Sequence, residues 1–292
     1  AQVRNLEQAA GIRVADRADL ILHIFSLRAR TQQARLQVEL ARLEHLRPRL
    51  RRMWTHLSRL EGGIGMRGPG ERQIETDRRI VDRRIADLRQ RIRLVRDRRA
   101  REVAARRGIP SVSLIGYTNA GKTTLWNRLV HEAAFVTNLP FATLDTRTRQ
   151  CFPGGDRKIL LSDTVGFIRK LPHRLIASFH ATLEETLRAD LLLHVIDAAA
   201  PRPEQEIAVV EEVLRELRCD DRPRWRILNK SDRVRDMGLV PLLRRDAGET
   251  LLLSGRTGEG IDLLRSRLAA WARAGGGGAG PPPADAPSSA SD

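Results

Sequence analysis

The sequence predicts an α/β fold in which a long helical hairpin precedes a sheet domain with a phosphate-binding loop. Residues 111–273 alternate apolar strands with amphipathic helices, which is the pattern of a mostly parallel sheet covered on both faces. Upstream, apolar residues recur at three- and four-residue steps along two stretches, as they do in helices that pack along one side. A glycine-containing loop between the first strand and the first helix of residues 111–273 supports the same class.

Residues 1–26 are expected to be the end of an N-terminal α/β domain whose remainder is not in this chain. Within them, the run Leu20–Phe25 is compatible with a buried strand or with a short helix. Residues 275–292 consist of glycine, proline, alanine, serine and aspartate, cannot bury apolar surface, and are expected to be a disordered tail.

Residues 27–107 predict an antiparallel helical hairpin. Its first helix should run from Leu27 to about Leu60, and Pro48 should kink or divide it because proline has no backbone N–H. Its second helix should run from Glu71 to about Arg106. The tip between them, residues 62–70, contains five glycines, so it can approach a flat partner closely. A flexible connector is the alternative interpretation of this tip.

The positive charge is concentrated in the N-terminal part of the chain. The net charge is +16, and residues 1–110 contain 27 arginines, no lysine and 13 acidic residues, which accounts for +14 of it. Such an excess is typical of proteins that contact RNA phosphates, although a solvated charged face is the simpler alternative. The dense arginine face of the two helices includes Arg47, Arg49, Arg51, Arg52, Arg78, Arg79, Arg83, Arg84, Arg89, Arg91, Arg93, Arg98 and Arg99.

The sheet domain, residues 108–274, carries three nucleotide-reading motifs in order. Residues 116–123 fit G-x-x-x-x-G-K-[ST], whose backbone N–H groups cradle phosphates while the lysine reaches the β- and γ-phosphates and the hydroxyl binds Mg²⁺. After the strand Ile159–Leu161, Asp163 can hold Mg²⁺ through a water, and the Gly166 amide can meet the γ-phosphate.

The third motif, Asn229-Lys230-Ser231-Asp232, identifies the base. The Asp232 carboxylate can accept from the N1–H and the 2-amino group of guanine, and adenine lacks that amino group. Sites of this kind reject the analogue by about 10⁴-fold or more, so GTP is favoured over ATP. The predicted nucleotide-binding residues are Gly116, Tyr117, Thr118, Asn119, Ala120, Gly121, Lys122, Thr123, Thr124, Asp163, Gly166, Asn229, Lys230, Asp232, Ser254 and Gly255.

The lysine content supports the nucleotide motifs. Two of the only four lysines, Lys122 and Lys230, stand in these motifs, where a guanidinium would not replace a compact ammonium. Cys151 and Cys219 have no metal or disulfide spacing, which fits a reducing cytoplasm. No apolar stretch reaches eighteen residues and no signal-peptide pattern opens the chain, so we expect a soluble, cytoplasmic protein.

These motifs, together with the glycine tip and Phe141-Ala-Thr-Leu-Asp145, resemble the HflX family of ribosome-associated GTPases, in the Obg-HflX-like superfamily. The resemblance covers nearly the whole chain. The tip followed by Glu71-x-Gln73-x-Glu75-x-Asp77-Arg78-Arg79 is a signature of the family. Arg72 stands where the family commonly has threonine, and this departure bears on contacts made by the tip.

The resemblance implies a Mg²⁺-dependent GTP hydrolase that binds the large ribosomal subunit and its RNA and splits or rescues stalled ribosomes, particularly under stress. It assigns Thr143 as the threonine that meets Mg²⁺ and the γ-phosphate. The expected catalytic residues are Lys122, Thr143 and Gly166, and the expected metal ligands are Thr123, Thr143 and, through water, Asp163. The expected RNA-binding residues are Gly62, Gly63, Gly65, Arg67, Gly68, Gly70, Arg72, Arg78 and Arg79. A monomer is expected, and weak membrane association stays open.

Phe167 stands where Ras-like enzymes place the glutamine that orients the attacking water, so intrinsic hydrolysis should be slow and should need a partner or an ion. Asn119 lies where some related GTPases hold K⁺ against the phosphates, and a loop-stabilising side chain is the alternative role. A large-subunit assembly GTPase and a non-catalytic GTP-binding RNA-binding module are the alternative functions. A tRNA-modifying GTPase is disfavoured because that group uses a C-terminal cysteine, which this chain lacks.

Overall fold

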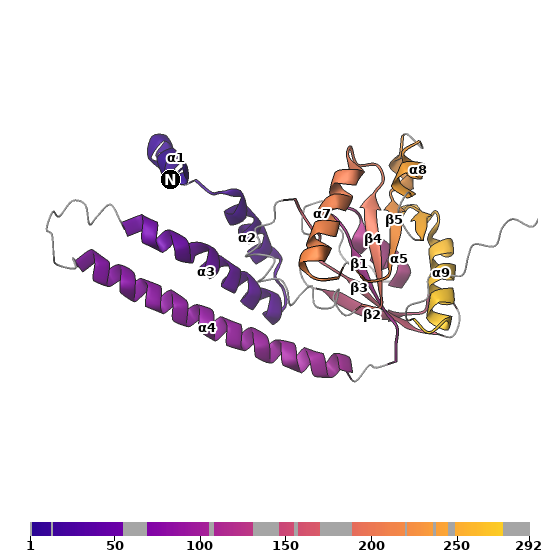
Figure 1. The fold of residues 1–292 in the computed structure, drawn as a ribbon, viewed down its shortest axis with the longest axis horizontal. Helices are drawn as coiled ribbons and strands as arrows, with labels where there is room; N and C mark the ends of the chain where they lie inside the picture. Colours follow the sequence, from indigo (N-terminus) through magenta and orange to yellow (C-terminus); the bar gives the residue numbers. More distant parts are fainter. Residues whose placement is uncertain are drawn as a thin grey trace, which may run out of the picture. The chain divides into compact units, whose positions relative to one another are not determined.

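The computed structural model describes residues 2–12, 14–54, 69–104, 108–130, 146–154, 157–169, 189–219, 221–235, 238–244 and 249–276. They form two compact units that divide between Ala104 and Gly108, and each unit is described by itself (Figure 1). Several sequence expectations fall outside the described residues. These are Thr143, tip residues 62–68, and tail residues 277–292.

The first unit is entirely helical in its described part. It contains α1 (Gln2–Ala10), α2 (Arg17–Arg28), α3 (Gln32–Trp54) and α4 (Pro69–Ala104). The run Leu20–Phe25 therefore lies in a helix, and the strand alternative is wrong. A reciprocal capping box starts α2, because the Asp16 carboxylate accepts from the Asp19 N–H at 2.8 Å and the Asp19 carboxylate accepts from the Asp16 N–H at 3.0 Å.

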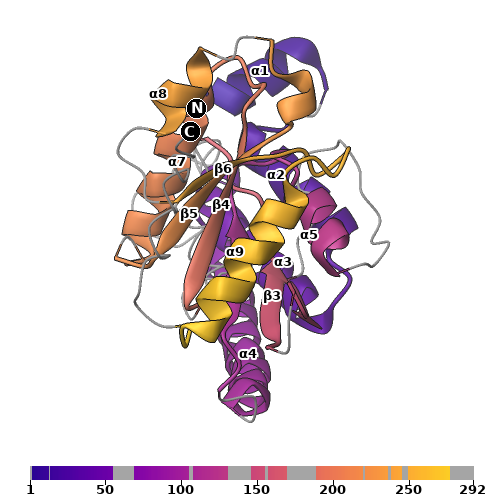
Figure 2. The same cartoon turned by 90° about the vertical axis from the view of Figure 1, so that its right-hand side faces the viewer.

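Helices α3 and α4 lie side by side in both views (Figures 1 and 2). Their shared core is formed by Leu40, Ile85 and Leu88, with Leu36, Leu43, Val81 and Ile92 packed against it. The expectation that Pro48 would divide the first helix is wrong, since α3 continues through it. Pro48 is exposed, so solvent can bond the carbonyl whose helical partner is missing. Helix α4 begins at Pro69, which places Gly70 in the helix rather than in the tip.

The second unit contains a six-stranded sheet in the order β2-β3-β1-β4-β5-β6. All neighbours pair in parallel except β2 and β3. The strands are β1 (Ser111–Ile115), β2 (Arg147–Cys151), β3 (Ile159–Asp163), β4 (Leu191–Asp197), β5 (Arg224–Asn229) and β6 (Thr250–Leu252). The sequence analysis missed β2 because this edge strand is polar, whereas the strands it recognised are apolar runs.

Helices cover both faces of the sheet (Figure 2). On one face, α5 (Lys122–Val130) and α9 (Ile261–Arg273) pack on a core that includes Trp126 and Trp271. On the other face, α7 (Pro203–Glu216) and the short α8 (Leu239–Arg244) pack on Ile196 and Leu228. Because the parallel strands end together, the loops that follow β1, β3, β4, β5 and β6 meet at one edge of the sheet.

Leu88→Ala tests the hairpin core. Leu88 is fully buried between α3 and α4, so its truncation should lower the free energy of unfolding by about 2–5 kcal/mol. Leu94→Ala on the same helix is the matched control: Leu94 is 63% exposed, and its truncation should change stability by no more than about 0.5 kcal/mol. Urea denaturation followed by circular dichroism measures both, and equal losses would contradict this packing.

Candidate nucleotide site and arginine-rich hairpin

The loop after β1 folds around the Lys122 ammonium. Nζ donates to the carbonyls of Gly116 at 3.0 Å and Tyr117 at 2.9 Å, and Lys122 is only 6% exposed. Burial lowers the pKa of Lys122 to about 8, and the nearby Asp163 carboxylate opposes this shift. An anion entering the loop would therefore meet a buried cation that lacks a direct ionic partner among the contacts described for it.

Two of the three residues expected to hold Mg²⁺, Thr123 and Asp163, lie together at the start of α5 and the end of β3. The Thr123 hydroxyl donates to the Asp163 carboxylate at 2.8 Å, and both side chains are buried. A hydroxyl and a carboxylate are the hard oxygen ligands that Mg²⁺ prefers, so this pair fits the ion.

The segment after Asp163 lies directly on the phosphate loop. The Phe167 carbonyl accepts from the Thr118 N–H at 2.7 Å, and the Phe167 N–H donates to the Gly116 carbonyl at 3.1 Å. A Cβ at Gly166 would stand 2.8 Å from the Thr118 Cα, so only glycine fits at this approach. Phe167 is 2% exposed, which makes its ring part of the core instead of a polar group facing the site.

The base-binding end is joined to the phosphate loop by Asn229. Its Nδ2 donates to the Ala120 carbonyl at 2.9 Å, and its Oδ1 accepts from the Gly255 N–H at 2.9 Å. Asn229 is 2% exposed, and a Cβ at Gly121 would collide with its amide. One side chain thus fixes the distance between the loop after β1 and the loop after β6.

Asp232 and Ser254 meet at the same end. Ser254 Oγ donates to Asp232 Oδ1 at 2.6 Å, and the Arg256 guanidinium lies 2.8 Å from Oδ2. The Ser254 hydrogen bond first, and the Arg256 charge to a lesser degree, hold the pKa of Asp232 below its ordinary value. The carboxylate is therefore ionised at neutral pH, which is the form that accepts N–H groups.

Three residues near these loops were not predicted from the sequence, and two of them support the loops directly. Asp197 accepts from Lys230 Nζ at 2.6 Å, and the same ammonium donates to the Asn119 carbonyl at 2.8 Å. Arg128 of α5 donates to the carbonyls of Gly255 and Arg256. Asp197 could have been found, because it directly follows the apolar strand at 191–196. Arg128 carries no such local signal.

Glu206 on α7 is the third missed residue. Burial, and then repulsion from Asp197, raise the pKa of Glu206 to about 7, while Lys230 and Lys122 oppose the shift. This carboxyl therefore titrates near neutral pH beside the lysines of the site.

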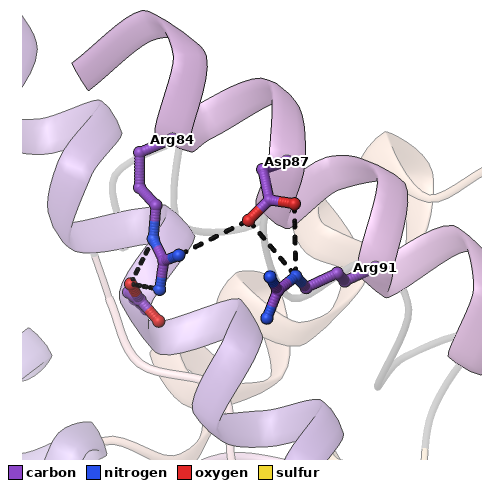
Figure 3. Close-up of polar contacts among 4 residues, drawn as sticks. Arg84, Asp87 and Arg91 are labelled. Carbon is purple, nitrogen blue, oxygen red and sulfur yellow. Dashed lines mark hydrogen bonds and ion pairs between the residues drawn. The ribbon is translucent and has the colours of Figure 1, made fainter. Parts of the chain in front are cut away.

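In the first unit, six hairpin arginines with described side chains form ion pairs. Arg84 pairs with Glu39 of α3 at 2.7 Å and with Asp87, and Arg91 also pairs with Asp87 (Figure 3). Further pairs are Arg89–Glu44, Arg47–Asp82, Arg78–Asp82 and Arg79–Glu75. Two of the expected RNA-binding residues, Arg78 and Arg79, are thus paired with acids on their own helix. Their partners are partly exposed, and such pairs are easily exchanged for other anions.

Two exposed arginines of α4, Arg83 and Arg93, have no ion pair with any residue that the structure describes. Gly70 and Arg72 lie in α4, where only their backbone is described, and the other predicted RNA-binding residues lie outside the described residues. Among the described side chains of α4, Arg83 and Arg93 are therefore the arginines most available to an external phosphate.

The fold and these loops define a P-loop GTPase domain. Residues 111–230 match a family described as "50S ribosome-binding GTPase", and residues 28–106 match "GTP-binding GTPase Middle Region". The chain is 48% identical over 272 residues to the GTPase HflX of Spirochaeta thermophila, and 48% identical over 273 residues to that of Escherichia coli. The chain belongs to the HflX family.

These alignments cover 92% of this chain but 66% and 64% of the two relatives, so the chain spans less than two thirds of their length. Among solved structures, it resembles a GTP-binding protein from Sulfolobus solfataricus in complex with GDP, with 26% identity and a TM-score of 0.56 over 92% of this chain and 76% of that one. None of the described helices combines the length and hydropathy needed to cross a bilayer.

Glu206→Gln tests the electrostatics of the site. A carboxyl whose pKa is raised from 4.5 to about 7 on folding stabilises the protein below about pH 4.5, and this contribution is lost as the pH rises to about 7. The variant should therefore gain melting temperature relative to the parent as the pH is raised through this window. Glu212→Gln, at an exposed position on the same helix, is the control: its melting temperature should differ from that of the parent by the same amount at every pH. A pH-independent difference for Glu206→Gln would contradict the shifted pKa.

Proposed function

We propose that the chain binds GTP with Mg²⁺ and hydrolyses it to GDP and phosphate. One observation carries the proposal: Asn229 joins the loop that buries Lys122 to the loop after β6, whose Ser254 holds the ionised Asp232. The phosphate-binding residues are the loop 116–123 with Thr124 and Gly166, and the base-binding residues are Asn229, Lys230, Asp232, Ser254 and Gly255. The family membership supports the same activity.

Mg²⁺ would be held by Thr123, by Thr143 and, through water, by Asp163; when bound, it supplies charge neutralisation on the phosphate oxygens. Lys122 neutralises the phosphates, and the Gly166 N–H orients the terminal one. The buried Phe167 offers no hydrogen bond to an attacking water, so turnover is slow until a partner or an ion supplies the missing stabilisation. We assign K⁺ and Asn119 to this role, because Asn119 is exposed on the loop while its carbonyl is held by Lys230.

We further propose that the partner is the large ribosomal subunit and its RNA. The description of the matched family and the arginine excess of the hairpin support this partner. RNA contacts are assigned to the tip residues Gly62, Gly63, Gly65, Arg67 and Gly68, and to Gly70, Arg72, Arg78 and Arg79. We extend this surface along α4 to the exposed Arg83 and Arg93. The domain division expected from sequence belongs to the same proposal, with residues 1–26 as the end of a further α/β domain.

The role that we propose is splitting or rescue of stalled ribosomes, in a monomeric, cytoplasmic protein. Subunit assembly would use the same RNA-binding face, and polysome profiles after depletion separate the two roles. Persistent stalled ribosomes with normal subunits support splitting, whereas accumulated precursor particles would contradict it.

Ribosomal RNA binding at several salt concentrations tests the hairpin. Arg83→Ala and Arg93→Ala should each lower affinity and reduce the slope of log K against log[salt] by about 1, because each removes one phosphate contact. Arg222→Ala removes the same charge from an exposed position in the sheet domain, and it should leave the slope unchanged. A slope change for Arg222→Ala as large as those of the other two would contradict the assignment.

GTP turnover with and without purified large subunits, in K⁺ and in Na⁺ buffer, tests the function. Large subunits should raise the rate tenfold or more, which corresponds to about 1.4 kcal/mol of barrier lowering. K⁺ should give faster turnover than Na⁺, and Asn119→Ala should remove the difference. If the chain binds GTP but hydrolyses none in all of these conditions, it is instead a non-catalytic binding module.

A further inference from the structure

The acceptor atom that should read the base is covered in this structure. Asp232 Oδ2 exposes less than 1 Å² to solvent, and the Arg256 guanidinium lies 2.8 Å from it. Ser254, which is fully buried, holds the other oxygen from inside the protein. The Arg256 side chain is 75% exposed, so it approaches the carboxylate from the solvent side, the side from which a base must arrive.

The backbone that carries Arg256 is fixed from several directions. The Gly255 N–H donates to Asn229, the Arg128 guanidinium donates to the carbonyls of Gly255 and Arg256, and the Thr257 N–H donates to Ser254 Oγ at 3.1 Å. The Gly258 N–H donates to the Ser254 carbonyl at 2.9 Å. Because the loop is held in this way, Oδ2 is uncovered by rotation of the Arg256 side chain and not by movement of the loop.

The contact between Arg256 and Asp232 is weak enough to break and re-form, so it can cover Oδ2 reversibly. It is an ion pair without the alignment of a hydrogen bond, since Oδ2 has no hydrogen-bond partner in the described structure. One partner is mostly exposed, and ion pairs of this kind are weak and are screened by salt. The two N–H groups of guanine can replace the guanidinium on the carboxylate, so the base and Arg256 compete for the same acceptor.

We propose that Arg256 is a gate over the guanine-reading carboxylate, which must swing away before the base can bind. This inference rests on the proposed function, because it assumes that Asp232 receives a guanine nucleotide. The gate lowers the association rate and the apparent affinity by the fraction of time that it stands closed. That fraction is set by an ion pair with one exposed partner, so its removal should accelerate association by about two- to fivefold.

Stopped-flow association of a fluorescent GTP analogue tests the gate. Arg256→Ala should bind about two- to fivefold faster than the parent chain, and Arg256→Lys, which keeps a cation, should fall between them. Rising salt should accelerate association in the parent relative to Arg256→Ala, because salt screens the closing pair. Arg222→Ala is the matched control: it removes an exposed arginine just before β5, at the opposite end of that strand from Asn229, and it should leave the association rate unchanged.

A second background separates a gate from a base contact. In Asp232→Asn, the neutral amide no longer holds the guanidinium and can donate to the carbonyl that xanthine has in place of the guanine amino group. Adding Arg256→Ala to this variant should leave the association rate of a fluorescent XTP analogue unchanged. Faster dissociation of GTP from Arg256→Ala with an unchanged association rate would overturn the gate and make Arg256 a contact to the bound base.

The same data distinguish failure of the gate from failure of the proposed function. If the parent binds the GTP analogue and Arg256→Ala binds it at the same rate, the gate is refuted and nucleotide binding stands. If neither the parent nor Arg256→Ala binds it, both the gate and the proposed function are overturned.

Discussion

The bridge made by Asn229 is the constraint on which the nucleotide site depends. Its amide contacts two loops that lie far apart in the sequence, through Ala120 and Gly255, and it is almost fully buried. A buried amide left without partners would be costly, so both loops are held where they satisfy it. Gly121 must be glycine because the amide occupies the space of a Cβ. The geometry of the phosphate end thereby fixes the geometry of the base end.

Lys230, the residue after Asn229, has a strained backbone conformation. Lys230 has φ 66°, in the left-handed region that a residue with a side chain rarely adopts. Its ammonium is held by Asp197 and by the Asn119 carbonyl, which compensates for the strain and ties the loop after β4 to the same cluster. The loops that follow β1, β4 and β6 are thus joined through the side chains of Asn229 and Lys230. Arg128 extends this support from α5 to the loop that carries Arg256.

The sequence predicted the sheet domain well because each of its nucleotide motifs follows an apolar strand, where periodicity and residue chemistry indicate the same structure. It predicted the second hairpin helix to within about two residues, since the Leu88 stripe has a clear period. It failed at β2, whose polar edge position carries no apolar pattern, and in allowing that Pro48 would divide α3, because solvent exposure at Pro48 tolerates a missing hydrogen bond. Tertiary contacts such as Arg128 with Gly255 and Arg256 with Asp232 join loops through side chains that have no local signature, so periodicity could not reveal them.

Equilibrium titration of this chain with GDP, GTP and ATP in the presence of Mg²⁺ measures how well Asp232 distinguishes guanine from adenine. We expect one site for GDP and GTP, with ATP weaker by about 10⁴-fold or more, because adenine cannot supply the two N–H groups that Asp232 is placed to accept. Equal affinity for ATP and GTP, or no binding of either guanine nucleotide, would contradict this expectation.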